Sequence, residues 1–228
     1  MFAFLHESGR VYLGTGEINT KYGKVKATGP GEVFSDKGEK FIVFELCLSD
    51  KIQKMKRLAR PIYEHDAGLI AGLLNIGVGK KVLEAGTGSG IMAMCLANFG
   101  ANVWSYEKRE DFYEQAKERL ANYPNIRLFN KDVSECEEEN FDAIFLDLQN
   151  PDNVIPKIIQ KLKLGHFIGC YTPIFDDVPK IWRAFQERCV SINAIQIHLQ
   201  KILVKKYARY DQKVFGFPGF FIWARRFR

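Results

Sequence analysis

The sequence lacks the features that assign a chain to a membrane or to a disulfide-bonded class. No apolar run reaches the roughly 18 residues that a membrane span requires, and residues 1–10 show no basic segment followed by an apolar one. We therefore expect a cytoplasmic protein with no membrane association. The 5 cysteines are an odd number and include no C-x-x-C pair, which argues against a disulfide framework and a zinc site. We expect reduced thiols and no metal.

Apolar residues and positive charge, by contrast, are plentiful. The 228 residues are 46% hydrophobic, enough for one full domain with a small appendage. The net charge of +6 favours a polyanionic partner. Lysine and arginine gather at 51–60, 201–209 and 224–228, whereas acids concentrate at 135–139. These clusters fit an RNA-binding surface and a merely solvated surface equally well.

The chain changes character near residue 50. Residues 1–50 are rich in glycine and alternating β-forming residues, which predicts a small all-β domain at 1–52. From Asp66 onward strands and helices alternate, which predicts an α/β domain at 53–228 with a mostly parallel sheet covered by helices on both faces. The expected strands are 80–86, 102–107, 126–132, 141–148 and 165–172, and the expected helices are 66–77, 89–100, 109–123, 153–163 and 178–188.

Two long β-prone segments follow, at 192–207 and 216–226. The connection between them, 208–215, is too short for a crossover helix. We therefore expect the two segments to pair antiparallel at the end of the sheet.

The segment VLEAGTGSG at 82–90 places Glu84 just before three closely spaced glycines. A P-loop is excluded, because no lysine followed by serine or threonine comes after the glycines. A dinucleotide fingerprint requires G-x-G-x-x-G, whereas the third glycine comes one residue early here, and Glu84 would face a pyrophosphate unfavourably. An acid at this strand end suits a cationic ligand. Glu107 and Asp132, at the tips of the next two strands, should border the same crevice, with Glu107 placed to bind a ribose diol.

This ordered set resembles the S-adenosylmethionine-dependent methyltransferases of class I, which have a Rossmann-like fold and a mostly parallel seven-stranded sheet. The resemblance implies S-adenosyl-L-methionine as cofactor, with Glu84 near its sulfonium and ammonium groups, Glu107 on the ribose hydroxyls and Asp132 at the adenine amino group. For Asp132 taken alone, a solvated turn or a helix cap is the commoner explanation. The expected cofactor-binding set is Glu84, Gly86, Thr87, Gly88, Ser89, Gly90, Glu107, Lys108, Asp132, Val133 and Asp147.

Asp147 ends the fourth expected strand, in the segment FLDLQNP, where Pro151 stiffens the loop beyond. A helix N-cap is the alternative role for this carboxylate. Asn150 or Asp152 could fill that role equally well, which favours a functional role for Asp147. In enzymes of the class, this position carries chemistry on the acceptor side.

Four segments resemble one family of the class, the tRNA adenine-N1 methyltransferases that modify the T-loop adenine at tRNA position 58: they are 82–90, 106–120, 145–151 and 211–226. The likeness covers about residues 55–228, and the β domain matches the family's architecture. It implies that Asp147 is catalytic. A carboxylate that accepts a hydrogen bond from the exocyclic amine pushes electron density toward the weakly nucleophilic N1, which then displaces the methyl group in one step.

Two stretches depart from the family's pattern. A T-Q-x-x-Y-P-K-D motif reads ARPIYEHD here, which keeps Tyr63 and Asp66 but puts Arg60 at the glutamine position. Near the last strand, Phe217 and Pro218 replace a His-Thr pair. We expect altered methionyl contacts at the first stretch and altered acceptor contacts at the second.

An RNA substrate requires groups that bind phosphates and a pocket for an unstacked adenine. Tyr171 is the candidate for the base, and Lys205, Lys206 and Arg209 are the candidates for phosphates. The resemblance implies a homotetramer, and we expect the aromatic run at 215–223 to serve mostly as a subunit interface and less as core. Two alternatives stay open: a methyltransferase acting on another acceptor, and a non-catalytic tRNA-binding subunit.

Overall fold

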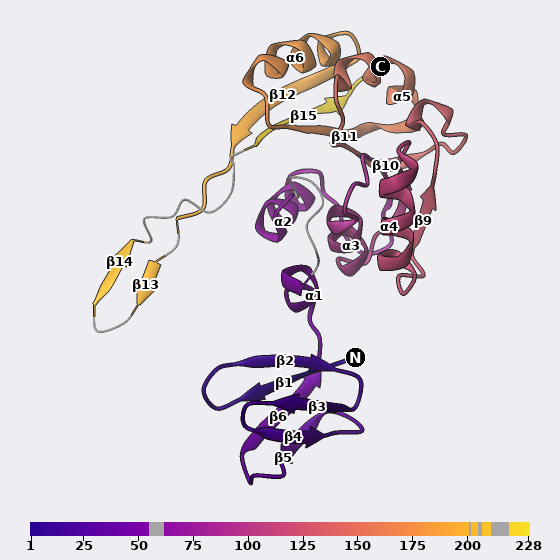
Figure 1. Cartoon of the computed structure of the whole chain (residues 1–228). Coiled ribbons are helices and arrows are strands. Elements are labelled where there is room, and N and C mark those ends of the chain that lie inside the picture. Colours follow the sequence, from indigo (N-terminus) through magenta and orange to yellow (C-terminus); the bar gives the residue numbers. More distant parts are fainter. Residues whose placement is uncertain (55–61, 201, 205–206, 211–218) are drawn as a thin grey trace. The chain divides into compact units, whose positions relative to one another are not determined.

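The chain divides into two compact units, residues 1–56 and 57–228. The computed structural model describes residues 1–54, 62–200, 202–204, 207–210 and 219–228 (Figure 1). The predicted domain boundary between residues 52 and 53 falls inside helix α1 (Leu48–Lys54) and stays a prediction. Within the described ranges, no helix combines the length and the apolarity that crossing a membrane requires.

The N-terminal unit consists of strands up to α1, as its alternating sequence predicts. Strands in the order β2-β1-β6-β5 form an antiparallel sheet, and β3 pairs with β4 in a separate hairpin. Phe4 of β1 and Phe41 and Val43 of β6 share one buried core with Val25 of β4, because alternate strand residues face the same side. The strands are β1 (Phe2–His6), β2 (Val11–Gly14), β3 (Glu17–Thr20), β4 (Gly23–Lys26), β5 (Gly31–Phe34) and β6 (Lys40–Glu45).

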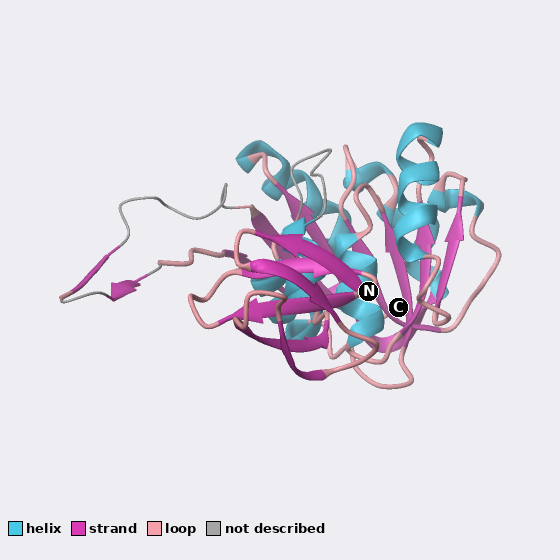
Figure 2. Ribbon diagram, turned by 60° about the horizontal axis from the view of Figure 1, so that its bottom comes forward, coloured by secondary structure: helices cyan, strands magenta, loops and turns pink. Residues whose placement is uncertain are grey.

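The second unit is built on a seven-stranded sheet in the order β12-β15-β11-β10-β7-β8-β9 (Figures 1 and 2). The neighbouring strands β11, β10, β7, β8 and β9 run parallel. Strand β15 is antiparallel to both of its neighbours, β11 and β12. The mostly parallel sheet is therefore confirmed. Chain order reverses at β7, and in such sheets ligands bind beside this point at the carboxyl edge. The strands are β7 (Lys81–Ala85), β8 (Asn102–Tyr106), β9 (Ile126–Phe129), β10 (Phe141–Leu146), β11 (Leu162–Thr172), β12 (Cys189–Gln196) and β15 (Phe220–Arg226).

Strand alternation on β7 assigns its side chains to two faces. Leu83 and Ala85 belong to a buried cluster that includes Phe185 of the last helix. Glu84 lies between them in sequence and so faces the other side of the sheet, where it is fully buried. A carboxylate therefore sits inside one of the most buried strands. The α-helices described in this unit are α2 (Glu64–Leu73), α3 (Ile91–Asn98), α4 (Glu110–Leu120), the short α5 (Ile155–Ile158) and α6 (Val178–Gln186).

The expected helix at 153–163 is wrong as a single element. The segment forms three short helical pieces, η2 (Pro151–Asn153), α5 and η3 (Ile159–Lys161), and β11 already begins at Leu162. Pro151 and Pro156 stand in the first turns of two of these pieces, and a proline supplies no backbone N–H for a longer helical ladder.

The antiparallel pairing of the two C-terminal segments is confirmed in β12 and β15. The first segment is shorter than expected, because β12 ends at Gln196. Beyond it, β13 (Ile202–Val204) pairs with β14 (Ala208–Tyr210) in a hairpin that joins no other strand among the described residues. Residues expected to be a connector thus supply the second strand of this hairpin.

The aromatic run was expected to form mostly a subunit interface, and this is wrong for Phe221. Its side chain is fully buried and stacks on Phe145 with ring centroids 6.4 Å apart, because β15 lies between two other strands. Phe220 is partly buried against the same unit's core, and Trp223 stacks on Phe221. Phe215 and Phe217 lie outside the described residues.

Candidate active site at the carboxyl edge of the sheet

A cavity of about 790 Å³ lies at the carboxyl ends of the parallel strands. Its size is typical of pockets for small molecules and cofactors. Most of the residues predicted for the site line this cavity, whereas Glu84 and Gly90 do not, within the described part of the chain. The predicted residues that line it are Gly86, Thr87, Gly88, Ser89, Glu107, Lys108, Asp132, Val133, Asp147 and Tyr171.

The glycine loop brings the backbone of β7 against that of β10. Gly86 has a φ of +87°, and a Cβ at this position would overlap the backbone carbonyl of Asp147. Only glycine combines this conformation with such close approach. The N–H of Asp147 donates to the carbonyl of Ala85 at 2.9 Å, so the loop and the acid that ends β10 are fixed to each other.

Glu107 is buried at the end of β8 and is held by backbone amides. Gly88 donates its N–H to Oε2 and Arg109 donates its N–H to Oε1, both at 2.9 Å. A carboxylate has about four lone-pair positions, so each oxygen keeps acceptor capacity toward the cavity. This geometry suits a pair of vicinal hydroxyls.

Glu84 is fully buried beneath the glycine loop. Oε2 accepts a hydrogen bond from Ser105, whose hydroxyl also contacts that of Thr87 at 2.6 Å. Oε1 has no partner among the described residues. Burial, together with Asp147 and Glu107, raises the pKa of Glu84 to about 8 against the opposing bond from Ser105. Glu84 is not among the described residues that line the cavity. Its predicted contact with a ligand therefore stays a prediction.

Asp132 caps a short helix, η1 (Val133–Glu135), so the helix-cap explanation is confirmed. Its Oδ1 accepts the backbone N–H of Ser134 at 3.0 Å and the hydroxyl at 2.8 Å. These bonds lower the pKa of Asp132. The residue also lines the cavity, and its contact with an adenine amino group stays a prediction.

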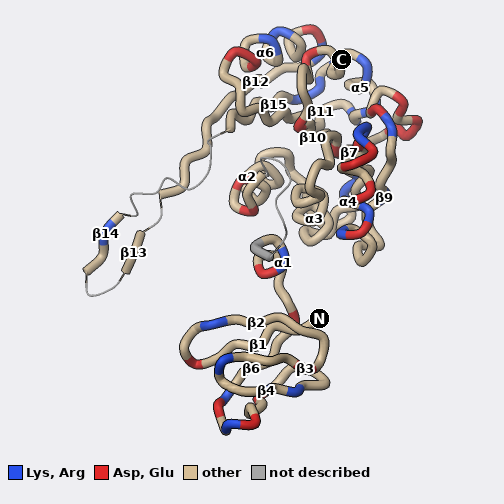
Figure 3. Tube along the Cα trace, viewed as in Figure 1, with Lys and Arg blue, Asp and Glu red and all other residues tan. Residues whose placement is uncertain are grey.

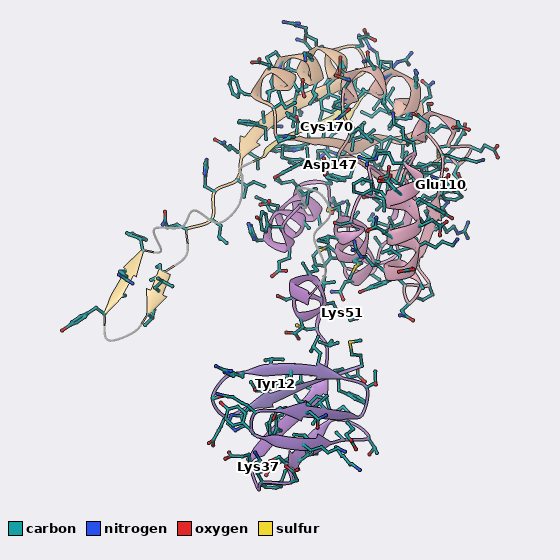
Figure 4. All side chains as sticks on the ribbon, in the orientation of Figure 1. Tyr12, Lys37, Lys51, Glu110, Asp147 and Cys170 are labelled. Carbon is teal, nitrogen blue, oxygen red and sulfur yellow. The ribbon has the colours of Figure 1, made fainter. Side chains whose placement is uncertain are left out.

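Asp147 lies directly after β10 on the cavity wall (Figure 4). Burial and then the negative charge of Glu107 raise its pKa to about 7. Asn150, and not Asp147, occupies the N-cap position of η2, so the alternative role of this carboxylate as a helix cap is wrong. A half-buried carboxylate that titrates near neutral pH can accept a hydrogen bond or a proton from a bound group.

Glu84, Glu107 and Asp147 place three carboxyl groups at one point of the sheet edge, and burial raises the pKa of Glu84 and of Asp147, which shows the cost of ionising them together. Among the described residues, none of the three takes part in an ion pair, whereas α4 carries acids in its first turn and bases in its last turn, where Lys117 pairs with Glu114 (Figure 3). Buried acids without a cation are costly. A positively charged ligand would offset this cost, and the sulfonium and ammonium groups of S-adenosyl-L-methionine have the required charge. The residues present therefore fit that cofactor.

The opposite wall contains residues that sequence reasoning did not select. Thr172 is the last residue of β11, Ile174 and Asp177 follow it, and Ile62 precedes α2. Thr172, Ile174 and Asp177 could have been predicted from their position at the end of a strand, because the carboxyl ends of parallel strands meet at the same edge of the sheet. For Ile62 the pattern of the sequence offers no signal.

The predicted RNA-contacting residues are only partly placed. Tyr171 lines the cavity, and burial raises the pKa of its hydroxyl. Arg209 is exposed on β14 and does not line the cavity. The two lysines and the two departures from the family pattern lie outside the described residues; they are Lys205, Lys206, Arg60, Phe217 and Pro218.

Known proteins resemble this chain in fold and in sequence. A SAM-dependent O-methyltransferase from Thermotoga maritima superimposes with a TM-score of 0.85 at 25% identity, covering 100% of this chain and 92% of that one. This likeness confirms the expected Rossmann-like methyltransferase fold. The tRNA (adenine(58)-N(1))-methyltransferase TrmI of Thermus thermophilus is 35% identical over 165 residues, which are 68% of this chain and 65% of that protein.

The match to a second relative covers a larger share of both chains than the match to the Thermus protein. The tRNA (adenine(57)-N(1)/adenine(58)-N(1))-methyltransferase TrmI of Methanocaldococcus jannaschii is 28% identical over 230 residues, with 85% of this chain and 81% of that protein covered. The match to the Thermus protein spans slightly less than two thirds of its length. A family model described as the tRNA methyltransferase complex GCD14 subunit matches residues 52–215, well over half of the chain. This chain therefore belongs to the GCD14 family of tRNA methyltransferase subunits.

Proposed function

We propose that this protein is an S-adenosyl-L-methionine-dependent tRNA methyltransferase that modifies N1 of the T-loop adenine at position 58. The observation that carries the proposal is Asp147, a carboxylate on the cavity wall next to a cluster of acids suited to a cationic cofactor. Family membership and the names of the two TrmI relatives support the substrate.

The carboxyl edge of the sheet binds the cofactor in this proposal. Glu107 accepts the ribose hydroxyls with its free lone pairs, and Asp132 and Val133 lie at the adenine end. Gly86 and Gly88 let the backbone approach the methionyl part, and the remaining residues of the predicted set contribute backbone amides or wall contacts; they are Thr87, Ser89, Gly90 and Lys108. When bound, S-adenosyl-L-methionine supplies an electrophilic methyl group on its sulfonium. Glu84 lies behind the loop, where the positive charge of a bound sulfonium would favour the ionised form of its carboxyl group and be attracted to it.

Asp147 acts on the acceptor base. Its ionised carboxylate accepts a hydrogen bond from the exocyclic amine of adenine, which increases electron density at N1. As N1 takes the methyl group, positive charge develops on the ring, and the same carboxylate stabilises it or takes the amine proton. A pKa of about 7 keeps a large part of Asp147 ionised at neutral pH.

The acceptor base must leave the stacked T-loop to reach this wall. Tyr171 supplies an aromatic surface beside Asp147, as expected for recognition of an unstacked base. Basic residues outside the cavity, among them Lys205, Lys206 and Arg209, contact phosphates. We further propose that the protein works in the cytoplasm as a homotetramer, as the family resemblance implies.

Two measurements test the proposal in sequence. Calorimetric titration with S-adenosyl-L-methionine should show saturable binding. No measurable binding would identify a tRNA-binding subunit without catalysis. Bulk tRNA incubated with the protein and methyl-labelled cofactor should then gain label at N1 of adenine 58. Label at another base or on a hydroxyl, as the name of the Thermotoga structure suggests, would contradict the proposed acceptor.

A further inference from the structure

The short segment that follows β11 exposes two large apolar side chains at the rim of the cavity. Ile174 is 54% exposed, and Phe175 is 67% exposed. Pro173 and Ile174 line the cavity, and Phe175 is the next residue along the chain. Single exposed apolar residues are common in proteins, but neighbouring ones beside a binding cavity point to contact with a partner.

Hydrogen bonds fix the shape of this segment. The backbone N–H of Ile174 donates to the hydroxyl of Thr172 at 3.1 Å, and that hydroxyl donates to Asp177 at 3.2 Å. The N–H of Asp177 donates back to the carbonyl of Ile174 at 3.2 Å, at the start of η4 (Phe175–Asp177). Lys180 of α6 pairs with the other oxygen of Asp177 at 2.8 Å. The apolar side chains are therefore presented by an ordered turn, so that a partner covering them loses little affinity to ordering of the segment.

The ring of Phe175 is oriented by a second aromatic side chain. It meets Phe220 of β15 with ring centroids 5.2 Å apart and ring planes 63° apart. Phe220 is itself partly buried against the core of the same unit. The contact restricts the ring of Phe175, while most of this residue stays exposed. A ring that is both oriented and open suits stacking on a flat group.

The charges around the ring disfavour a phosphate as that group. Asp176 is exposed next to Phe175, and it would repel an anion. The nearby Lys180 is already paired with Asp177. A nucleobase, by contrast, has a flat uncharged face, and aromatic side chains bind bases that have left an RNA stack. The chemistry of this surface therefore fits a base better than it fits the RNA backbone.

We propose that Ile174 and Phe175 form a stacking surface for the nucleobase next to the acceptor adenine. The inference rests on the proposed function, because that function requires the acceptor to leave a stacked RNA loop. An adenine that enters the cavity uncovers one face of its neighbour, and an apolar surface at the rim of the same cavity can replace the lost stacking partner. The surface thereby lowers the free energy of unstacking without contacting the acceptor itself.

Kinetics on tRNA test this surface. Phe175→Ala should lower kcat/KM by about tenfold, as expected for the loss of one stack between an aromatic side chain and a base. Phe175→Tyr keeps the flat ring and should stay within about twofold of wild type. Phe227→Ala is the matched control and should keep the wild-type value, because Phe227 is 69% exposed but follows β15 at the opposite edge of the sheet. An unchanged kcat/KM in Phe175→Ala would overturn the proposal.

A change in the RNA distinguishes stacking from a role of the ring in the fold. A tRNA with an abasic nucleotide beside the acceptor, placed on its 5′ side in one RNA and on its 3′ side in another, lacks one neighbouring base. On the RNA that lacks the stacked base, Phe175→Ala should cause no further loss of kcat/KM. Equal losses on the intact and on both abasic RNAs, together with a lower Tm, would assign the ring to the fold and contradict the proposal.

Crosslinking separates this inference from the proposed function. The photoreactive residue p-benzoylphenylalanine replaces Phe175 in one variant and Phe227 in another, and each protein is irradiated with tRNA. Position 175 should crosslink to a nucleotide next to adenine 58, whereas position 227 should not. A crosslink to a second copy of the protein in place of the tRNA would identify a subunit interface and sink the inference, even if methyl transfer to N1 is confirmed. A crosslink to that nucleotide in a protein that leaves adenine 58 unmethylated would support the surface and refute the function.

Discussion

The two walls of the cavity are held in place by different parts of the chain. On the cofactor side, backbone groups make most of the contacts that fix the wall: amides of Gly88 and Arg109 bind Glu107, and Gly86 lies against the carbonyl of Asp147. On the acceptor side, side chains bind side chains, as in the hydrogen bond that the Thr172 hydroxyl donates to Asp177 at 3.2 Å. A fixed backbone geometry permits few residue types and therefore appears as a motif in the sequence. Contacts between side chains can be made by many combinations of residues and give no such motif.

Glycine substitutions test the cofactor wall most severely. Gly86→Ala would place a methyl group onto the carbonyl of Asp147 at a φ of +87°, so the loop must move. We expect cofactor affinity to fall by more than about 100-fold, together with a lower Tm. In Gly88→Ala, the nearest atom to the new methyl group is 3.8 Å away, and the φ is +51°, so the loss should be smaller. Calorimetric titration of both variants checks the order, and equal losses would contradict this account of the loop.

Removal of the acceptor carboxylate should separate binding from chemistry. Asp147→Ala takes away the group that accepts from the adenine amine but leaves the bonds that hold Glu107 intact. We expect kcat to fall by about two or more orders of magnitude, with a cofactor Kd within about threefold of wild type. Single-turnover methyl transfer together with equilibrium titration measures both quantities. Near-normal turnover would remove Asp147 from the mechanism.

The same division explains what the sequence reveals. The strands from β7 to β11, the helices α3 and α4, and the acids at the strand tips follow from apolar periodicity and from the rule that parallel strands end at one edge. Glu107 and Asp147 are placed by this rule alone. Asp132 is also placed by it, but its cap on η1 depends on the next residues and only the structure distinguishes that role.

The acceptor wall could not be predicted in the same way. Tyr171 and Gly219 lie far apart in the sequence, and nothing in the pattern of either segment indicates that the tyrosine ring packs against this glycine. The burial of Phe221 was missed for a related reason, because the sequence does not show that β15 lies inside the sheet between β11 and β12. Contacts between distant side chains follow from the assembled fold.

The pH dependence of catalysis is a milder test of the acceptor wall. Burial and Glu107 raise the pKa of Asp147 to about 7, and only the ionised form can accept from the amine. Activity should therefore be full above about pH 8 and should fall about tenfold for each unit below pH 7. A profile of kcat/KM between pH 5 and 9 measures this, with folding followed by circular dichroism. A profile that is flat through pH 7 would show that Asp147 is not the titrating group.

The smallest expected effect concerns Glu84, the acid behind the cofactor wall. Its pKa is about 8 in the folded protein and has an ordinary value of 4.5, so folding favours the protonated form. The stability of the cofactor-free protein that depends on this group is present below about pH 4.5 and is lost as the pH rises toward 8. Glu84→Gln removes the titration, so its Tm should exceed that of wild type by roughly 2–4 °C at pH 8, and by less at pH 5.

Cofactor should reverse this advantage. If the acid cluster balances a cationic ligand, S-adenosyl-L-methionine stabilises the wild type more than Glu84→Gln, and the difference in Tm shrinks or changes sign at saturation. Glu118→Gln, on the exposed face of α4, serves as the control with no expected change in either condition. An equal increase in the Tm of Glu84→Gln with and without cofactor would mean that the buried acid destabilises the fold and contributes nothing to cofactor binding. The cofactor wall would then depend on Glu107 and the glycine loop alone.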